Sequence, residues 1–167
     1  MKIQDLMIRE VETCTATTDL AAVSMSMWRQ DCGIVPVIDH TRRVLGVITD
    51  RDICMALATR HRRPEDLTAQ EVMSGRLFSV RPDDDVRVAL ETMRTQRVRR
   101  LVVTDAEQRL RGMVSINDVV LHAQPSGGRP TPLLSANDVL LTLQGICGHP
   151  VPAKRPKEKE QRVAVHA

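Results

Sequence analysis

The sequence predicts an α/β (α+β) protein in which two tandem β-α-β-β-α units pack as a pseudo-twofold pair, followed by one further helix. The first observation is an internal repeat: residues 7–53 align without a gap with residues 73–119. The second is that each copy combines short apolar runs, typical of strands, with apolar residues at helical spacing. A unit that occurs only twice indicates duplication rather than a solenoid. Because small sheets are unstable alone, the copies are expected to bury each other's apolar faces.

Local signals place the elements of the first copy. Polar capping types at residues 17–19, with an acidic charge at the positive end of the helix dipole, predict the start of a helix. Gly33 is expected to end this helix, because glycine tolerates positive φ. Thr49 is expected to cap the next helix. The elements of this copy, three helices and three strands, are expected at residues 3–8, 11–13, 19–30, 34–38, 44–48 and 49–58.

The second copy repeats this order. Asp83, Asp84 and Asp85 predict the start of a helix that runs to Gln96, and Ser115 predicts the cap of a helix at residues 116–122. Strands are expected at residues 77–80, 100–104 and 110–114. The chain is therefore divided into a first motif at 1–59, a linker at 60–67, a second motif at 68–123, a linker rich in proline and glycine at 124–134, a C-terminal helix at 135–147 and a disordered tail at 148–167.

Composition narrows the function classes. The aromatic share is 1%, which disfavours the stacking platforms of single-strand nucleic-acid binders. The net charge of +3 is carried by residues 153–167, so the rest of the chain is neutral and nucleic-acid binding is not expected. The basic tail is interpreted as a solvated segment, with contact to a polyanion left open. No apolar run is long enough to span a bilayer, and the N-terminus does not read as a signal peptide, so a cytoplasmic protein is expected.

Cysteines and histidines give no sign of a metal or catalytic centre. The cysteines Cys14, Cys32, Cys54 and Cys147 form no Cys-x-x-Cys pair and are interpreted as small buried apolar residues, with a disulfide such as Cys14–Cys147 left open. The five histidines lack metal-ligand spacing. Because nucleotide-binding glycine loops and a nucleophile–base pair are also missing from the sequence, we expect neither a metal site nor an enzyme.

Two segments resemble the core signature of a CBS domain. Residues 34–39 read Ile-Val-Pro-Val-Ile-Asp, and residues 44–53 read Val-Leu-Gly-Val-Ile-Thr-Asp-Arg-Asp-Ile. The second copy looks the same at residues 99–105 and 110–119. The whole chain is similar to bacterial stand-alone CBS pairs, or Bateman modules. The resemblance implies a disc-like homodimer and up to two ligand clefts per chain, which in this family commonly take AMP, ADP, ATP, S-adenosylmethionine or a related adenosyl ligand.

The resemblance also implies the site residues. Thr49 with Asp52, and Ser115 with Asp118, match a capping box that needs no ligand. In the resembling family this strand-to-helix junction faces the cleft, so the carboxylates are expected to bind ribose hydroxyls and the side-chain hydroxyls a phosphate. Both roles can coexist. The candidate ligand-binding residues are Thr13, Cys14, Val35, Pro36, Thr49, Arg51, Asp52, Ser79, Arg99, Arg100, Leu101, Ser115, Asn117 and Asp118.

The sequence leaves the roles of Pro36, of an arginine group and of several methionines open. Pro36 removes a ladder donor and suits an edge strand or a bulge, although nearby backbone groups could read an adenine edge. Three arginines at residues 97–100 form either a solvated face or a phosphate site. The first copy has Asp31 and Gly33 where the second has arginines, so the two clefts are not expected to bind equally. Methionines on the long helices, Met25, Met27 and Met93, are assigned to the core, with a dimer interface as the alternative.

The function expected from these features is that of a regulatory or sensor module. It binds an adenosyl ligand between the two motifs, needs no cofactor, and acts in trans on an unidentified protein partner. The alternative is a structural or stress-response dimer without a physiological nucleotide.

Overall fold

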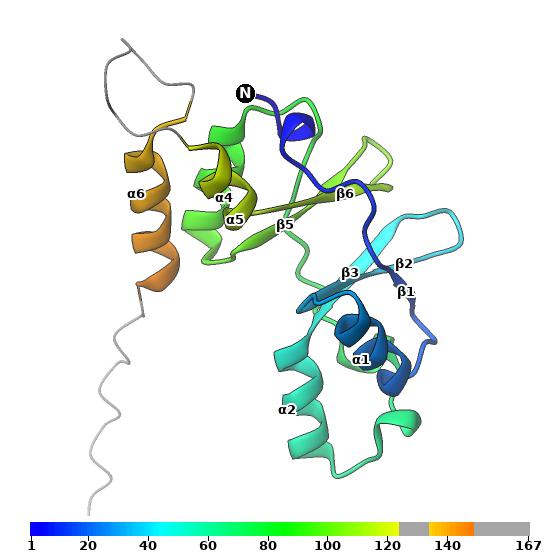
Figure 1. The fold of residues 1–167 in the computed structure, drawn as a ribbon. Coiled ribbons are helices and arrows are strands. Elements are labelled where there is room, and N and C mark those ends of the chain that lie inside the picture. Colours follow the sequence, from blue (N-terminus) through cyan, green and yellow to red (C-terminus); the bar gives the residue numbers. More distant parts are fainter. Residues whose placement is uncertain (124–133, 149–167) are drawn as a thin grey trace, which may run out of the picture.

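The structure, a computed structural model, describes residues 1–123 and 134–148. It contains two three-stranded sheets, one in each half of the molecule (Figure 1). The first sheet consists of β1 (Cys14–Thr15), β2 (Ile34–Ile38) and β3 (Val44–Thr49), and the second of β4 (Ser79–Val80), β5 (Arg100–Thr104) and β6 (Leu110–Ser115). In both sheets the middle strand is parallel to the first strand and antiparallel to the third.

Helices flank these sheets in the same order in both halves. The first half carries α1 (Leu20–Arg29) and α2 (Asp50–Arg60), and the second α4 (Val86–Gln96) and α5 (Ile116–His122). Shorter helices and one C-terminal helix complete the described fold: η1 (Ile3–Asp5), η2 (Pro64–Asp66), α3 (Ala69–Val72) and α6 (Ala136–Cys147). The predicted α/β fold of two tandem units plus a C-terminal helix is confirmed. The predicted linker at 124–134 and tail at 148–167 lie almost wholly outside the described residues.

The repeat seen in the sequence is repeated in the backbone. Val37 pairs with Gly46 in the first sheet and Val103 with Gly112 in the second, and a register shift follows each of these pairs. The residues after α1 and α4 also match, because Asp31 has a φ of 47° and Arg97 a φ of 56°. The offset of 66 residues therefore relates the strand pairing, the register shift and the turn after the long helix in the two halves.

The end of α1 differs from the prediction. The helix ends at Arg29, and the residue with positive φ is Asp31 rather than Gly33. Aspartate enters the left-handed region more readily than most residues, so no glycine is required there. Gly33 instead lies against Asp50, whose Oδ2 would be 2.9 Å from a Cβ at this position.

The first segments of each copy also differ from the prediction. The N-terminal helix expected at residues 3–8 is a single 3-10 turn, because Ile8 pairs with Met113 of the other half. The strands expected at 11–13 and 77–80 are found at Cys14–Thr15 and Ser79–Val80. The segment before each of these strands pairs with the sheet of the other half, at Ile8 with Met113 and at Ser74 with Val47. Its residues therefore cannot extend the first strand of their own sheet.

Pro36 lies in a middle strand, so the edge-strand interpretation is wrong. The missing N–H is tolerated because β1 pairs only with Val37 and Ile38, one residue further along β2. The register shift of β2 also follows immediately, between those two residues. In the second half the equivalent Val102 donates its N–H to the carbonyl of Phe78 at 3.3 Å.

The two halves exchange short segments, and this exchange joins them. Ile3, Leu6 and Met7 belong to the apolar core of the second half, and the N-terminus lies with that half in Figure 1. Leu67 and Ala69 belong to the core of the first half. Each half therefore buries apolar side chains from the segment that precedes the first strand of the other half, so neither core is complete without the other half.

Glycines allow these exchanged segments to approach the sheets. A Cβ at Gly46 would lie 2.6 Å from the carbonyl oxygen of Ser74, and a Cβ at Gly112 would lie 2.5 Å from that of Ile8. These two glycines occupy the same position of the repeat. A side chain at either position would push the exchanged segment off the sheet.

Further contacts join the hairpins of the two sheets. Val44 donates its N–H to the carbonyl of Gln108 at 3.0 Å, and Leu110 donates to Arg42 at 2.9 Å. The buried side chains of Val44, Val102 and Leu110 form an apolar cluster between the halves. The predicted burial of one copy's apolar surface by the other is confirmed.

The C-terminal helix covers the second half only. α6 packs against α4 and α5, and its Val139 and Thr142 are buried. Gly145 of α6 lies so close to Arg94 of α4 that a Cβ there would overlap the arginine side chain. Within the described residues, no helix is long and apolar enough to cross a membrane.

Several residues expected in the core lie at the surface. Met27 and Met93 are buried, as predicted, but Met25 is half exposed. Trp28, three residues further along α1, is also exposed. All four cysteines are free; Cys14 is buried, whereas Cys54 and Cys147 are exposed, so the buried interpretation is wrong for those two. They lie on outward-facing helix positions, where an apolar neighbourhood in sequence does not imply burial in space.

Candidate functional site

Two clefts lie between the halves, and each takes residues from both. The first, with a volume of about 300 Å³, contains Thr49 and Asp52 and is called the Asp52 cleft. The second, with a volume of about 350 Å³, contains Ser115 and Asp118 and is called the Asp118 cleft. Both volumes are at the lower end of the range typical of small-molecule sites. The offset of 66 residues relates most of their lining residues, so the clefts are equivalent positions of the repeat.

A capping box forms the polar corner of each cleft. Thr49 donates its hydroxyl to Oδ2 of Asp52 at 2.7 Å and its N–H to the same oxygen at 3.0 Å, and the N–H of Asp52 donates back at 3.2 Å. Ser115 and Asp118 repeat this arrangement with distances of 2.7, 2.7 and 3.3 Å. The capping interpretation of both pairs is therefore confirmed.

The capping boxes leave acceptor capacity in both clefts. All cap bonds use Oδ2, and no hydrogen bond from the described residues reaches Oδ1 of Asp52 or Asp118. A carboxylate oxygen accepts hydrogen bonds from hydroxyl groups of a ligand, and such charge-assisted bonds are strong. Each cleft thus offers an unoccupied carboxylate oxygen beside its strand-to-helix junction.

A capping box by itself is not evidence of a ligand site. Ser135 and Asp138 form the same arrangement at the start of α6, with distances of 2.7, 3.0 and 3.2 Å, but they line neither cleft. These hydrogen bonds hold the pKa of Asp138 below its ordinary value. The distinguishing feature of Asp52 and Asp118 is therefore their position between the two halves.

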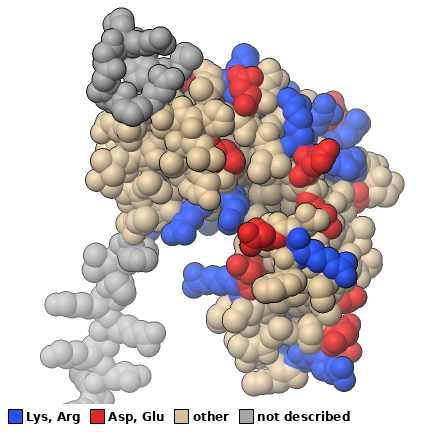
Figure 2. Space-filling model, viewed as in Figure 1, with Lys and Arg blue, Asp and Glu red and all other residues tan. Residues whose placement is uncertain are grey.

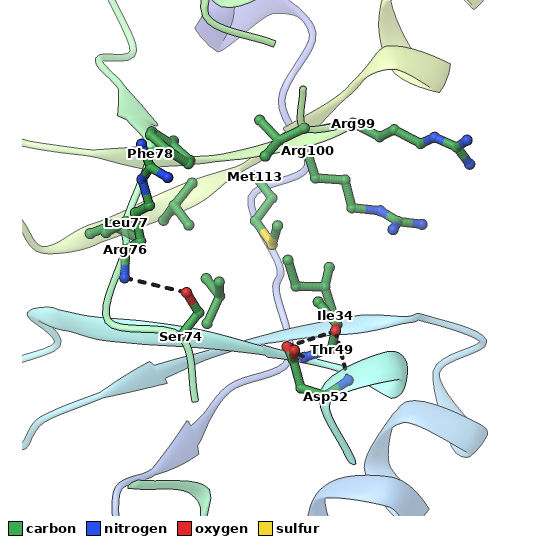
Figure 3. Close-up of a pocket in the computed structure, with 13 residues that line it drawn as sticks. Ile34, Thr49, Asp52, Ser74, Arg76, Leu77, Phe78, Arg99, Arg100 and Met113 are labelled. Atoms are coloured by element: carbon green, nitrogen blue, oxygen red, sulfur yellow. Dashed lines mark hydrogen bonds between the residues drawn. The ribbon is translucent and has the colours of Figure 1, made fainter. Parts of the chain in front are cut away.

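The walls of the Asp52 cleft are apolar with a basic rim. Figure 3 shows Thr49 and Asp52 on the first half, and Phe78, Met113 and three arginines on the second. Phe78 is one of only two aromatic residues in the chain, and its ring lies 5.2 Å from the guanidinium carbon of Arg76. An apolar wall with a few fixed polar groups suits a flat, partly polar small molecule.

Three arginines line the Asp52 cleft. Arg99 and Arg100 extend in the same direction in Figure 3, and Arg76 lies at the opposite end of the cleft. None of their guanidinium groups has a carboxylate within 4.0 Å among the described residues. Three arginines against one aspartate give this lining a formal charge of +2.

The Asp118 cleft has the opposite charge. Glu10, Glu12 and Asp31 line it together with Asp118, and Arg100 is its only basic lining residue among those described. Four carboxylates against one arginine give a formal charge of −3. Basic and acidic side chains both border the hollow between the halves in Figure 2. The two equivalent clefts therefore differ sharply in charge.

The structure brings some of the predicted site residues together and separates others. Seven of the fourteen line one or both clefts: Thr49, Asp52, Arg99, Arg100, Ser115, Asn117 and Asp118. Thr13, Cys14 and Val35 line a separate cavity between β1, β2 and α1. Arg51, Pro36, Ser79 and Leu101 line neither cleft. Leu101 and Val35 point into the cores of their own halves, because alternate residues of a strand face opposite sides of the sheet.

Several lining residues were not predicted from the sequence. They include Ile8, Glu10, Val11, Glu12, Val47, Ser74, Arg76 and Met113. Most belong to the exchanged segments before β1 and β4, and the shift of both strands toward the C-terminus brings these segments to the clefts. No pattern within a single segment indicates most of these residues, because they reach the clefts only through the exchange of segments between the halves.

The described residues contain no group of three or more histidine, cysteine or carboxylate side chains that could hold a metal ion. Cys14 lies in the cavity beside α1, and burial raises the pKa of its thiol to about 11. A thiol with a raised pKa is a poor nucleophile at neutral pH. This cavity therefore offers packing rather than reactive chemistry.

Comparison with protein families gives a match across both halves. A family model described as the CBS domain matches residues 3–59 and again residues 69–124. The two matches together cover more than half of the chain, and they correspond to the two copies of the repeat.

Individual relatives match the same region. An uncharacterized protein of Methanopyrus kandleri is 26% identical over 112 residues, covering 67% of this chain and 57% of the relative. YlbB of Bacillus subtilis is 29% identical over 124 residues, covering 74% and 82%. An inosine-5'-monophosphate dehydrogenase of Methanocaldococcus jannaschii is 26% identical over 119 residues, covering 71% and 23%. This chain thus spans just over half of the first relative and about a quarter of the dehydrogenase.

Solved structures share the fold. Hypoxic Response Protein I, crystallised with two coordinated zinc ions, has a TM-score of 0.67 and 27% identity, covering 74% of this chain and 100% of that chain. A CBS domain protein from Pyrobaculum aerophilum, crystallised with AMP, has a TM-score of 0.65 and 26% identity, covering 71% and 90%. The fold of the two paired halves thus occurs in proteins of known structure.

Proposed function

The chain belongs to the CBS-domain family, and from this membership we propose that it is a regulatory module that binds an adenosyl compound between its two motifs. The observation that carries the proposal is the position of Asp52 and Asp118. Each lies in a cleft built from both halves and keeps one carboxylate oxygen free of cap bonds. A ribose offers two neighbouring hydroxyl groups that a carboxylate can bind. The AMP complex of the Pyrobaculum aerophilum relative supports this ligand class.

The role proposed is binding rather than catalysis. The hydroxyl groups of Thr49 and Ser115 are engaged in helix caps with Asp52 and Asp118, and no histidine is among the described lining residues. Nucleophilic catalysis requires a nucleophile within reach of a general base, and this arrangement does not supply one. The ligand acts here as a signal and not as a substrate.

Ligand binding would act through the arrangement of the two halves. Both clefts contain residues from both sheets, so a ligand contacts the two motifs at once. A ligand that binds one arrangement more tightly shifts the population toward it. We propose that a protein partner binds in trans to one of these arrangements. Ligand binding has a regulatory effect only if another protein distinguishes the two conformations.

We also propose that two chains associate through the outer face of α1 and α2. Trp28 and Met25 of α1 and Met55 of α2 are 84%, 50% and 53% exposed, and clustered exposed apolar side chains are typical of an interaction site. In the second half, α6 already covers the equivalent helix α4. A second copy of the chain supplies an apolar surface of matching size on the uncovered side.

The test of ligand binding uses melting temperature and calorimetry on the full chain. AMP, ATP and S-adenosylmethionine are each added up to millimolar concentration. We expect at least one to raise the melting temperature, because a ligand at 100 times its Kd stabilises the folded state by about 2.7 kcal/mol. We expect the increase to be lost in the double variant Asp52→Ala and Asp118→Ala.

The matched control is Asp138→Ala. This variant removes an identical capping box outside both clefts, so it loses about 1 kcal/mol of stability while keeping the ligand response. If no adenosyl compound shifts the melting temperature, or if the shift survives in the double variant, the proposal is wrong. The alternative of a structural dimer without a nucleotide ligand would then be favoured.

A further inference from the structure

We propose that the two clefts sort adenosyl ligands by charge: the Asp52 cleft takes a phosphorylated nucleoside, and the Asp118 cleft takes an adenosyl compound that carries a positive charge in place of phosphate. This inference rests on the proposed function, because it assigns a ligand class to each cleft. It follows from comparing the two clefts position by position. Since the repeat makes them equivalent in backbone, their difference lies in the side chains.

Charge is exchanged at corresponding positions of the repeat. Arg76 lines the Asp52 cleft, and its counterpart Glu10 lines the Asp118 cleft. Phe78 corresponds to Glu12 in the same way. Both residues of each pair line a cleft, but they differ in charge or polarity. These differences between the repeats therefore alter ligand preference while the backbone stays equivalent.

The arginines of the Asp52 cleft are available to an anion. Arg76, Arg99 and Arg100 form no ion pair with the described residues, and the lining carries a formal charge of +2. Guanidinium groups bind phosphate oxygens in a bidentate manner. Asp52 supplies the acceptor for ribose, and Phe78 supplies a flat apolar wall. The cleft therefore combines the groups that a nucleoside phosphate requires.

The Asp118 cleft repels an anion. Glu10, Glu12, Asp31 and Asp118 line it, although Glu12 also lines the cavity beside α1, where its carboxylate accepts a hydrogen bond of 2.8 Å from the hydroxyl of Ser26. A phosphate in this cleft would face a lining with a formal charge of −3, and like charges in a partly enclosed cleft interact more strongly than in bulk water. Only Arg100 offsets them, and it is shared with the other cleft.

A positively charged adenosyl compound meets the opposite situation. Its ribose has the same acceptor, Asp118, while a sulfonium or ammonium group on its 5′ side is attracted by the surrounding carboxylates. S-adenosylmethionine carries both cationic groups and serves as the probe. The two clefts together would then report two classes of adenosyl metabolite through one fold.

Calorimetry on the full chain tests this assignment with AMP, S-adenosylmethionine and the uncharged compound 5′-methylthioadenosine. We expect one AMP per chain, lost in Asp52→Ala and kept in Asp118→Ala. We expect S-adenosylmethionine to show the reverse dependence. Because the arginines of the Asp52 cleft are solvent-accessible, AMP affinity is expected to fall as salt concentration rises.

Exchange of repeat counterparts gives a sharper test. In the variant Glu10→Arg with Glu12→Phe, the Asp118 cleft carries the residues of the other cleft, and we expect a second AMP to bind. In Arg76→Glu with Arg99→Gly, we expect AMP affinity to fall by about tenfold or more. Arg111→Glu changes net charge outside both clefts and controls for nonspecific attraction.

The outcomes separate the inference from the function on which it rests. If AMP fills both clefts of the unmodified chain with similar affinity, sorting by charge is wrong and the sensing function stands. The same holds if S-adenosylmethionine binding survives Asp118→Ala. If none of the three compounds binds, both proposals fail.

Discussion

At the scale of single residues, the environment of a thiol decides its reactivity. Burial raises the pKa of Cys14 to about 11, while Cys147 is exposed at the end of α6. Because the thiolate is the reacting species, a rise of about two units above the ordinary value lowers its fraction at pH 8 by about 100-fold. The two cysteines are therefore distinguishable by chemistry alone.

We predict that iodoacetamide at pH 8 modifies the exposed Cys147 on the order of 100-fold faster than the buried Cys14. Peptide mass spectrometry over a time course measures both rates in one sample. In denaturant the two rates should converge, which serves as the internal control. Equal rates in the folded protein would show that Cys14 is not shielded.

Glu71 gives a second prediction at the residue scale. Hydrogen bonds from the N–H of Thr68, from Arg62 and from the Thr68 hydroxyl lower its pKa to about 2. A carboxylate whose pKa is lowered by folding stabilises the folded state above its ordinary pKa of 4.5, and this contribution disappears as the pH falls toward 2. Glu71→Gln should therefore reduce the loss of melting temperature between pH 4.5 and pH 2.

The control for this prediction is Glu107→Gln. The Glu107 carboxylate is exposed and accepts no hydrogen bond from the described residues. Melting curves collected from pH 7 to pH 2 should run parallel for this variant and the unmodified chain. A Glu71→Gln curve that also runs parallel would contradict a role of the Thr68–Glu71 box in acid stability.

At the scale of elements, the approach of exchanged segments to the sheets depends on two glycines. Gly46→Ala places a Cβ 2.6 Å from the Ser74 carbonyl oxygen, and this oxygen cannot move without breaking the backbone pairing of Ser74 with Val47. We predict a loss of about 1–3 kcal/mol in unfolding free energy, the usual cost of overpacking. Urea denaturation measures the change.

Gly75→Ala is the matched control for this prediction. It lies in the same exchanged segment, but nothing within 4 Å surrounds a Cβ at that position. Its unfolding free energy should equal or slightly exceed that of the unmodified chain, since alanine restricts the unfolded state. If both variants lost a similar amount of unfolding free energy, the close contact at Gly46 would not be the cause, and the exchanged segment would be sensitive to any substitution of glycine.

The elements also show why part of the fold was predictable. Strands 34–38 and 100–104 and helix 116–122 begin and end where the sequence predicts, because apolar runs and capping residues are local signals. The first strand of each copy was misplaced by two or three residues. Its position depends on pairing with the other half, and single-segment patterns carry no information on that pairing.

At the scale of the whole molecule, the cleft residues also divide into those that local sequence signals indicate and those that depend on the assembly of the two halves. Asp52 and Asp118 could be placed from sequence because the segments that carry them resemble the CBS-domain signature, and this resemblance implies that their strand-to-helix junction faces a cleft. Arg76 and Glu10 could not, since they reach the clefts only after the halves exchange segments. The position of a binding residue is local information, whereas the charge of a cleft is a property of the assembled pair.

The outer helices of the two halves differ at the same scale. Trp28 on α1 corresponds to Arg94 on α4, and Met25 corresponds to Glu91. Arg94 and Glu91 form a hydrogen-bonded ion pair on the helix that α6 covers. The first half is thus apolar where the second is charged, and the apolar helix face is the one without a covering helix.

We therefore predict that the full chain is a dimer in solution and that Trp28→Arg, which introduces the residue of the second copy, converts it to a monomer. The reason is that a guanidinium group cannot be buried in an apolar interface without a partner. Light scattering coupled to size exclusion measures the mass. Leu121→Arg, at an exposed apolar position of the second half, should leave the dimer intact. Dissociation by Leu121→Arg but not by Trp28→Arg would place the interface on the second half, and the asymmetry of the outer helices would then need another explanation.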